Sequence, residues 1–245
     1  MKIFIDSADL EEIKKYLSWG ICDGVTTNPT ICLKCGVRGG LEGIKQRTTE
    51  IAKLIAPRPV SAEVTSEDPE EILKQDRDYA KLADNVAVKV TITDREGNSF
   101  LPVIRKLVSE GIRVNVTTMT TFNQAILAAK AIDAGLKTNP QTKKSNFISI
   151  FAGRISEEHG VEQAFKVIKN VRQWLDFYRF EGIEIIVGSV RSPENVELWA
   201  RAGAHILTIP PEIIAKSLLG ARTKETVVQF IEDAKKSLED LEKEQ

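Results

Sequence analysis

The sequence predicts an α/β protein built as a parallel (β/α)8 TIM barrel with an additional C-terminal helix. Short apolar runs alternate eight times with longer segments of helical periodicity within about 220 residues. No glycine-rich GxGxxG fingerprint follows any run, which argues against an open doubly wound sheet. No linker rich in glycine, serine or proline divides the chain. We therefore expect one barrel domain over residues 1–245, with residues 223–245 as its C-terminal helix.

The first four strand–helix pairs are bounded by residues that commonly begin or end such elements. A helix opens at Asp9 with an acidic first turn, and Ser7 is its candidate cap. Pro29 ends the second strand, and Pro69 begins the helix after the third. The strands are expected at residues 2–7, 24–29, 59–64 and 85–93, and later helices at 41–55, 69–83 and 99–110.

The second half of the chain repeats this pattern and then adds one helix. Strands are expected at residues 112–118, 147–152, 184–190 and 205–210, with helices at 121–134, at 157–180, from 193 and after 210. The added helix begins at Thr223, and one face carries Val227, Phe230, Ile231, Ala234, Leu238 and Leu241. Two interpretations stay open: this face packs on the chain's own barrel, or on a neighbouring subunit.

Two polar segments are interpreted as insertions. Residues 137–145 follow a helix, so they fall at the N-terminal face of the barrel, away from the chemistry. We expect them to form a surface or subunit-contact loop. Residues 94–98 follow a strand instead, and we expect them to shape the rim of the pocket.

Composition excludes several classes of partner. The net charge of −1 favours neither nucleic acid nor a membrane surface as a partner. No apolar run reaches the roughly 18 residues of a membrane helix. The first residues lead directly into a strand without a signal-peptide layout, so a cytoplasmic location is expected.

The three cysteines do not predict a metal or redox site. Cys32 and Cys35 have a CxxC spacing, and Cys22 lies nearby in the sequence. A zinc site would need further ligands, but His159 and His205 are far away in the chain. We expect reduced thiols, no bound metal and no cofactor.

Polar residues recur near the C-terminal ends of the predicted strands. Parallel barrel strands are buried on both sides, so such residues need an explanation. The carboxyl ends of the strands form the face where barrel enzymes place their sites. For Thr26 and Asn115 a purely structural role remains an equal alternative. The residues are Asp6, Thr26, Asn28, Glu63, Lys89, Asn115, Thr117, Ser149 and Ser189.

Lys89 lies in the middle of the apolar strand at residues 85–93. Burying an unpaired ammonium is costly, and the usual relief is loss of its proton, which leaves an amine able to attack carbonyls. The alternative is an edge strand whose second face contacts water. The polar residues expected on the same face favour the nucleophile.

Two arginines follow neighbouring strands. Arg154 comes after the sixth strand and Arg191 after the seventh. An isolated arginine is usually a surface residue. Here Ser189 and a helix starting near Pro193 add donors suited to phosphate or a similar oxyanion. An amine, a carboxylate partner and an anion clamp together suggest class I aldol chemistry on an anionic sugar.

Seven segments carry a family resemblance that extends over almost the whole chain. They are FID at 4–6, GVTTNPT at 24–30, VSAEV at 60–64, VKV at 88–90, NVT at 115–117, FAGR at 151–154 and GSVR at 188–191. In these segments the chain resembles the small transaldolases and the related fructose-6-phosphate aldolases.

The resemblance implies a reaction. Lys89 would attack C2 of a ketose and form a Schiff base, and Asp6 would take the proton of the C4 hydroxyl. The C3–C4 bond then breaks, and a dihydroxyacetone unit stays on the lysine until an aldose acceptor arrives. Glu63 and Thr117 would hold the water used in proton transfer.

The resemblance also implies how the substrate is held. Asn28 and Ser149 would bind hydroxyls of the dihydroxyacetone part, while Arg154, Ser189 and Arg191 would hold the anionic end. The resemblance further implies a homo-oligomer, a pentamer or a decamer.

Two positions favour transaldolase over aldolase within this family. The chain has Glu63 and Phe151, where the similar aldolases have glutamine and tyrosine. Phenylalanine has no hydroxyl to protonate the enamine, so the enamine would wait for an acceptor. An aldolase that releases free dihydroxyacetone remains one alternative, and a non-catalytic barrel that binds a sugar phosphate remains another.

The departures from the family pattern leave the donor open. Thr91 stands where the similar proteins usually have proline. Ile150, directly after Ser149, is also at a position where they usually have proline. The candidate donors are fructose 6-phosphate and its sulfonate analogue, 6-deoxy-6-sulfofructose.

Overall fold

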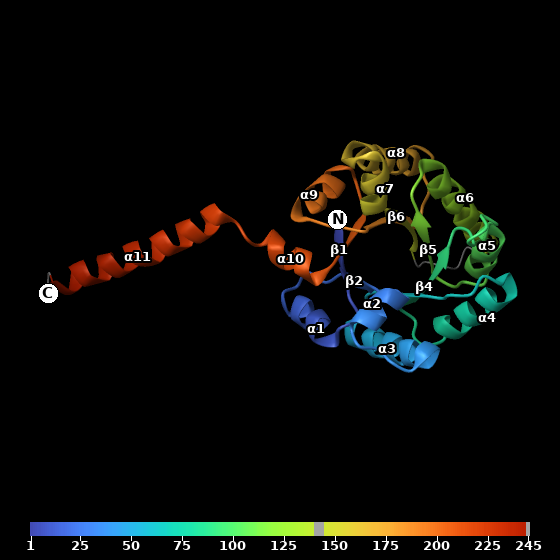
Figure 1. Cartoon of the computed structure of the whole chain (residues 1–245), viewed down its shortest axis with the longest axis horizontal. Coiled ribbons are helices and arrows are strands. Elements are labelled where there is room, and N and C mark those ends of the chain that lie inside the picture. The colour runs from blue at the N-terminus through green and yellow to red at the C-terminus, as the bar shows by residue number, and fades with distance from the viewer. Residues whose placement is uncertain (140–144, 244–245) are drawn as a thin grey trace.

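Parallel strands close into a barrel in which each strand pairs with its neighbours in the chain and the last pairs with the first. This computed structural model describes residues 1–139 and 145–243, with side chains described up to residue 238 (Figure 1). The strands are β1 (Lys2–Asp6), β2 (Gly24–Thr26), β3 (Val60–Glu63), β4 (Val86–Thr91), β5 (Val114–Met119), β6 (Asn146–Phe151), β7 (Ile183–Gly188) and β8 (Ile206–Ile209). The predicted (β/α)8 barrel is confirmed.

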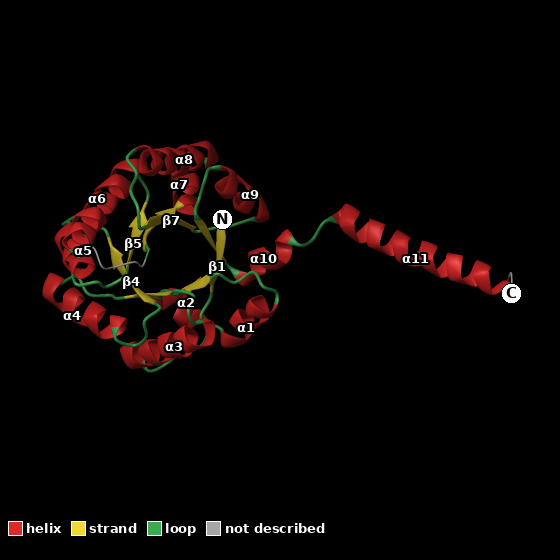
Figure 2. Cartoon of the chain, turned by 180° about the vertical axis from the view of Figure 1, so that it is seen from behind, coloured by secondary structure: helices red, strands yellow, loops and turns green. Residues whose placement is uncertain are grey.

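Helices surround this barrel in a ring (Figure 2). The ring helices are α1 (Leu10–Ser18), α2 (Pro29–Lys34), α3 (Gly40–Ile55), α4 (Pro69–Ala80), α5 (Leu101–Ser109), α6 (Phe122–Thr138), α7 (Ala152–His159), α8 (Val161–Phe177), α9 (Pro193–Arg201) and α10 (Pro211–Ser217). A final helix, α11 (Ala221–Lys243), follows them. The pattern of apolar residues therefore predicted the order of the elements correctly.

Three local details differ from the prediction. Pro29 both follows β2 and begins the short helix α2, which was not predicted. The helix expected over 157–180 is divided into α7 and α8, because Gly160 between them has a φ of +84° that ends the helical backbone. Asp9, rather than Ser7, caps α1, since its carboxylate accepts from the backbone N–H groups of Glu11 and Glu12.

A small apolar layer fills the barrel below the site. Phe4, Ala87, Phe147, Ile186 and Ile206 form this cluster, and the rings of Phe4 and Phe147 meet edge to face with centroids 5.9 Å apart. Side chains two residues apart on a strand point to the same side. The next inward residues are therefore Asp6, Lys89, Ser149, Gly188 and Thr208. The apolar layer thus forms the floor on which the polar residues stand.

The two predicted insertions have different outcomes. In the segment 137–145, Lys137 and Thr138 belong to the last turn of α6, and residues 140–144 lie outside the described residues. Residues 94–98 form a turn in which the Asp94 carboxylate accepts from the backbone N–H groups of Glu96 and Asn98. They are not among the residues that line the main pocket described below.

The last helix extends away from the barrel (Figures 1 and 2). Residues 221–238 are all exposed, including Phe230 at 66% and Ile231 at 52%. The interpretation that this face packs on the chain's own barrel is therefore wrong. The side chain of Leu241 lies outside the described residues. Among the described helices, none combines the length and apolar character needed to cross a membrane.

Candidate active site

A pocket of about 640 Å³ opens at the carboxyl ends of the strands. Its wall brings together residues that the sequence analysis took from six strands and the segments after them. Eleven of the twelve predicted site residues line it: Asp6, Thr26, Asn28, Lys89, Asn115, Thr117, Ser149, Phe151, Arg154, Ser189 and Arg191. The twelfth, Glu63, is not among the lining residues but contacts Lys89.

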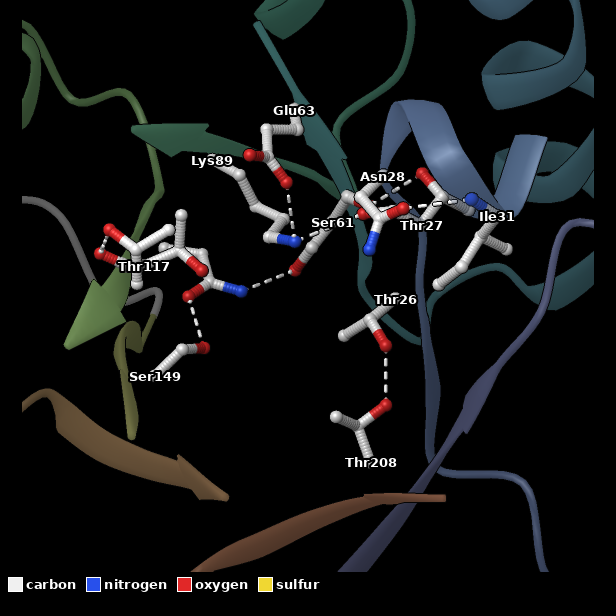
Figure 3. A network of polar contacts seen from close by, with 12 residues as sticks. Thr26, Thr27, Asn28, Ile31, Ser61, Glu63, Lys89, Thr117, Ser149 and Thr208 are labelled. Carbon is white, nitrogen blue, oxygen red and sulfur yellow. Dashed lines mark hydrogen bonds and ion pairs between the residues drawn. The ribbon is translucent and has the colours of Figure 1, made fainter. Parts of the chain in front are cut away.

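Lys89 is buried, with 5% of its surface exposed. Its Nζ donates to Glu63 Oε2 at 2.8 Å and to the carbonyl oxygen of Thr27 at 3.1 Å (Figure 3). Glu63 and Lys89 are direct neighbours in the register of β3 and β4. The amine therefore has a carboxylate partner on the neighbouring strand. Glu63 is also close enough to exchange a proton with Nζ.

Asp6 faces the same pocket from β1. Its Oδ1 accepts a hydrogen bond from Thr26 Oγ1 at 2.6 Å. Burial raises the pKa of Asp6, while the hydrogen bond from Thr26 and the charge of Lys89 partly oppose that rise. This carboxyl is therefore easier to protonate than an ordinary aspartate, which suits a group that takes up and returns a proton.

Thr208 orients the hydroxyl of Thr26. The two Oγ1 atoms are hydrogen-bonded to each other (Figure 3). A threonine hydroxyl has one proton, so when Asp6 is ionised and accepts the proton of Thr26, Thr208 is the donor to Thr26. The result is a relay from β8 through β2 to the carboxylate on β1.

A second chain of hydrogen bonds crosses the opposite side of the barrel. Asn115 Nδ2 donates to Ser61 Oγ at 3.1 Å, and Ser149 Oγ donates to Asn115 Oδ1 at 2.7 Å (Figure 3). Both ends of the Asn115 amide are therefore bonded to protein. This favours a positioning role for Asn115, the structural alternative raised above.

Two further residues keep polar atoms for a ligand. Asn28 caps α2, because its Oδ1 accepts from the backbone N–H of Ile31 at 2.8 Å. The Nδ2 group of Asn28 then remains as the donor on the pocket side. Thr117 is fully buried, and its Oγ1 has no hydrogen-bond partner among the described residues. A buried hydroxyl of this kind is suited to hold a water or a substrate oxygen.

The arginine end of the pocket depends on a close backbone contact. Ser189 has a φ of +61°, in the left-handed region that serine rarely adopts. A Cβ atom on Gly153 would lie 2.0 Å from the Ser189 carbonyl oxygen. Only glycine at this position lets the start of α7, which carries Arg154, approach Ser189 so closely.

The sequence analysis missed Ser61 and Thr208. A signal for both was present, because each is a polar residue inside an apolar run and Ser61 stands two residues before Glu63 on the same strand face. The pocket rim also includes Lys34, Cys35 and Lys216 from the helices α2 and α10 and their ends. No periodic pattern marked these rim residues.

Within the described residues, no three His, Cys, Asp or Glu side chains are arranged as a metal site would require. Cys22, Cys32 and Cys35 are free thiols. Burial raises the pKa of both Cys22 and Cys32, which makes these thiols less reactive.

The fold and the pocket together define a (β/α)8-barrel enzyme with a buried lysine amine paired with a carboxylate at the carboxyl ends of its strands. The sequence model of the Transaldolase/Fructose-6-phosphate aldolase family matches residues 3–245. The chain belongs to this family, as its motifs predict.

Individual relatives agree with this assignment. A protein named probable transaldolase from Hyphomonas neptunium is 39% identical over 237 residues, which cover 97% of this chain and 98% of that protein. Another protein of that name, from Alkaliphilus metalliredigens, is 37% identical, with 95% of this chain and 97% of the relative covered. The prediction of a transaldolase-type enzyme is confirmed by the family and these relatives.

Solved structures share the fold at low identity. Thiamine phosphate pyrophosphorylase from Pyrococcus furiosus superposes with a TM-score of 0.55 at 8% identity, over 85% of each chain. At this identity the likeness supports the barrel fold alone.

Proposed function

We propose that the chain is a transaldolase that carries a dihydroxyacetone unit on Lys89, from an anionic ketose to an aldose acceptor. The observation that carries this proposal is the buried Lys89 amine, which lies at the pocket wall and bonds to Glu63. Asp6 lies on the same wall, and the charge of Lys89 acts to lower the pKa of Asp6. An amine with a proton acceptor beside it is suited to form a Schiff base with a ketone.

Schiff-base formation uses Lys89, Glu63 and Thr117. Nζ attacks C2 of the ketose, the N–C bond forms, and the C2 oxygen leaves as water. Glu63, at 2.8 Å from Nζ, accepts the proton that the amine gives up. The Thr117 hydroxyl has no hydrogen-bond partner among the described residues, which suits it to hold the water that leaves.

Cleavage uses Asp6. Its carboxylate takes the proton of the C4 hydroxyl, the C3–C4 bond breaks, and the electron pair moves into the iminium to give an enamine. The raised pKa of Asp6 makes this proton transfer easier than for an ordinary aspartate. The aldose product leaves, and the same steps in reverse join the enamine to an acceptor.

The remaining residues hold the substrate. Asn28 and Ser149 bind hydroxyls of the dihydroxyacetone part, and Arg154, Ser189 and Arg191 bind the anionic end. The donor is fructose 6-phosphate or its sulfonate analogue, 6-deoxy-6-sulfofructose. No cofactor is needed, because the iminium formed on Lys89 takes up the electron pair of the broken bond.

The test of the proposal is reductive trapping. Borohydride added with fructose 6-phosphate should leave a dihydroxyacetone or ketose adduct on the Lys89 peptide in a mass spectrum, and Lys89→Met should leave none. A wild-type protein that binds the ketose but never forms an adduct would favour the non-catalytic sugar-phosphate barrel instead.

Phe151 decides between transferase and aldolase. Its ring lines the pocket and has no hydroxyl to protonate the enamine. We expect little free dihydroxyacetone without an acceptor, and Phe151→Tyr should increase its release several-fold in a coupled assay. If the wild type releases dihydroxyacetone at the rate of transfer, the chain is a fructose-6-phosphate aldolase.

We also propose a homo-oligomer, a pentamer or a decamer, in which α11 packs on a neighbouring subunit. The exposed apolar side chains of Val227, Phe230, Ile231 and Leu238 on α11 support it. Light scattering should give fewer subunits per particle for a chain ending at Leu219, and an unchanged number of subunits would exclude α11 from the contact. We propose the cytoplasm as the compartment, because the free thiols suit a reducing environment.

A further inference from the structure

Glu157 lies between the two arginines at the mouth of the pocket. It stands three residues after Arg154 on α7, so the two side chains share one helix face. Its Oε2 is 3.5 Å from Arg154 Nη1, and its Oε1 is 3.2 Å from Arg191 Nη2. One carboxylate therefore contacts both guanidinium groups, with one oxygen for each.

These contacts are loose. The side chain of Arg154 is 65% exposed, and those of Arg191 and Glu157 are each 53% exposed. Both distances exceed those of strong charge-assisted hydrogen bonds. Exposed ion pairs of this kind contribute little stability. Another anion of similar size can therefore replace the Glu157 carboxylate without a large loss.

The carboxylate also changes the charge that the site offers. Arg154 and Arg191 together carry two positive charges, and Glu157 reduces the sum for the three residues to one. An incoming anion must displace Glu157 or accept its repulsion, and that repulsion grows with the charge of the anion. A phosphate monoester carries about −1.5 to −2 near pH 7, so it meets more repulsion than a monoanion or an uncharged sugar.

We propose that Glu157 is a specificity-determining residue, a resident anion that competes with the substrate's anionic group for Arg154 and Arg191. It weakens the binding of dianions most, monoanions less and uncharged sugars not at all. This inference rests on the proposed function in one respect: Arg154 and Arg191 hold the anionic end of the donor.

Inorganic phosphate tests the competition without turnover. Calorimetry at fixed pH and ionic strength should give a dissociation constant that is roughly threefold to tenfold lower for Glu157→Gln than for the wild type. The matched control is Glu158→Gln, which removes the same charge from the next residue. Glu158 contacts His159 at 3.4 Å, and the structure gives it no ion pair with either arginine among the described residues. Its variant should stay close to the wild type.

Two results of this experiment overturn the inference. One is an unchanged or weaker phosphate affinity in Glu157→Gln. The other is phosphate binding that survives in Arg191→Gln, because the ion would then lie elsewhere.

Steady-state kinetics gives an independent readout. For Glu157→Gln the KM for fructose 6-phosphate should fall by a similar factor with kcat unchanged, while the KM for uncharged fructose stays the same. An equal change for both donors contradicts the inference. Reductive trapping on Lys89 keeps the two proposals separate. If Lys89 forms an adduct but Glu157→Gln does not change phosphate affinity, only the role of Glu157 is overturned. If Glu157→Gln tightens phosphate binding but Lys89 forms no adduct, only the transaldolase proposal is overturned.

Discussion

At the scale of single residues, the proton chemistry of this protein depends on the hydrogen bond that the Asp6 carboxylate accepts from a threonine hydroxyl. Thr208 donates to Thr26, and Thr26 donates to Asp6 at 2.6 Å. That bond stabilises the charged carboxylate and therefore opposes the rise that burial causes in the pKa of Asp6. Thr26 on β2, which contacts Thr208 on β8, thus opposes the rise that burial causes in the pKa of Asp6 on β1.

Thr26→Val should shift the acid limb of the kcat/KM profile to higher pH. The variant loses the hydrogen bond that lowers the pKa of Asp6, so that pKa rises further and the carboxylate is lost at a higher pH as the solution is acidified. Thr208→Val should shift the limb in the same direction by a smaller amount, because Thr26 stays but is less firmly oriented.

The measurement is kcat/KM for transfer at about half-unit pH steps, and Thr208→Ser, which keeps the hydroxyl, is the matched control. An acid limb that stays in place in Thr26→Val would show that Asp6 does not control it.

At the scale of elements, the approach of α7 to the end of β7 assembles the anion end of the pocket. Gly153 in the first turn of α7 allows this approach, since a Cβ there would lie 2.0 Å from the Ser189 carbonyl oxygen and 2.5 Å from its Oγ. Arg154 and Ser189 come from these two elements. Their relative position therefore depends on the absence of a side chain at Gly153.

Gly153→Ala should force α7 and the segment after β7 apart. Overpacking against backbone usually costs roughly 1–3 kcal/mol, and we expect a loss of that size in the free energy of unfolding by urea. The KM for fructose 6-phosphate should rise more than kcat falls, because the change affects the anion site rather than Lys89.

Gly188→Ala serves as a control for stability, since its Cβ would meet no atom closer than 3.4 Å, the Thr208 Cγ2. A Gly153→Ala protein as stable as the wild type, with the same KM, would contradict the close contact.

At the scale of the whole molecule, one buried acid makes the stability depend on pH. Asp76 on α4 is fully buried, and both carboxylate oxygens have no hydrogen-bond partner among the described residues. Burial raises the pKa of Asp76 well above its usual range. The folded protein therefore keeps this proton over a pH interval in which the unfolded chain has already lost it.

The sign of the effect follows from proton counting. Between the pKa of the unfolded chain, about 3.9, and the raised pKa in the fold, the native state binds more protons. The free energy of unfolding then falls as pH rises, by up to about 1.4 kcal/mol per pH unit from this group, and it levels off above the folded pKa. Asp76→Asn removes this slope.

We expect Asp76→Asn to gain stability relative to the wild type as the pH is raised from 4 to 7 in urea titrations. Asp78→Asn is the control on the same helix, since the Asp78 side chain is 45% exposed and lies near Lys81. A difference between Asp76→Asn and the wild type that stays constant with pH would mean that Asp76 is charged in the folded state.

Much of the candidate site could be predicted from the chain because strand residues alternate. The sequence indicates one face of a barrel, because Lys89 lies within an apolar run and Asp6, Glu63 and Ser149 lie at the ends of other runs. The strand residues among the eleven that line the pocket were predictable for this reason, and the others follow directly after strands. The rim residues from α2 and α10 could not be predicted, since their positions depend on how these short helices pack.

The order of the eight strands, most of the helices, the barrel class and the family motifs could be determined from the sequence by itself, because local periodicity and short motifs carry them. Only the tertiary structure decided that Glu63 pairs with Lys89, that Thr208 reaches Thr26, and that α11 leaves the barrel. Thr26 and Thr208 are 182 residues apart in the chain. Contacts over such separations depend on strand register and barrel closure, which no local pattern encodes.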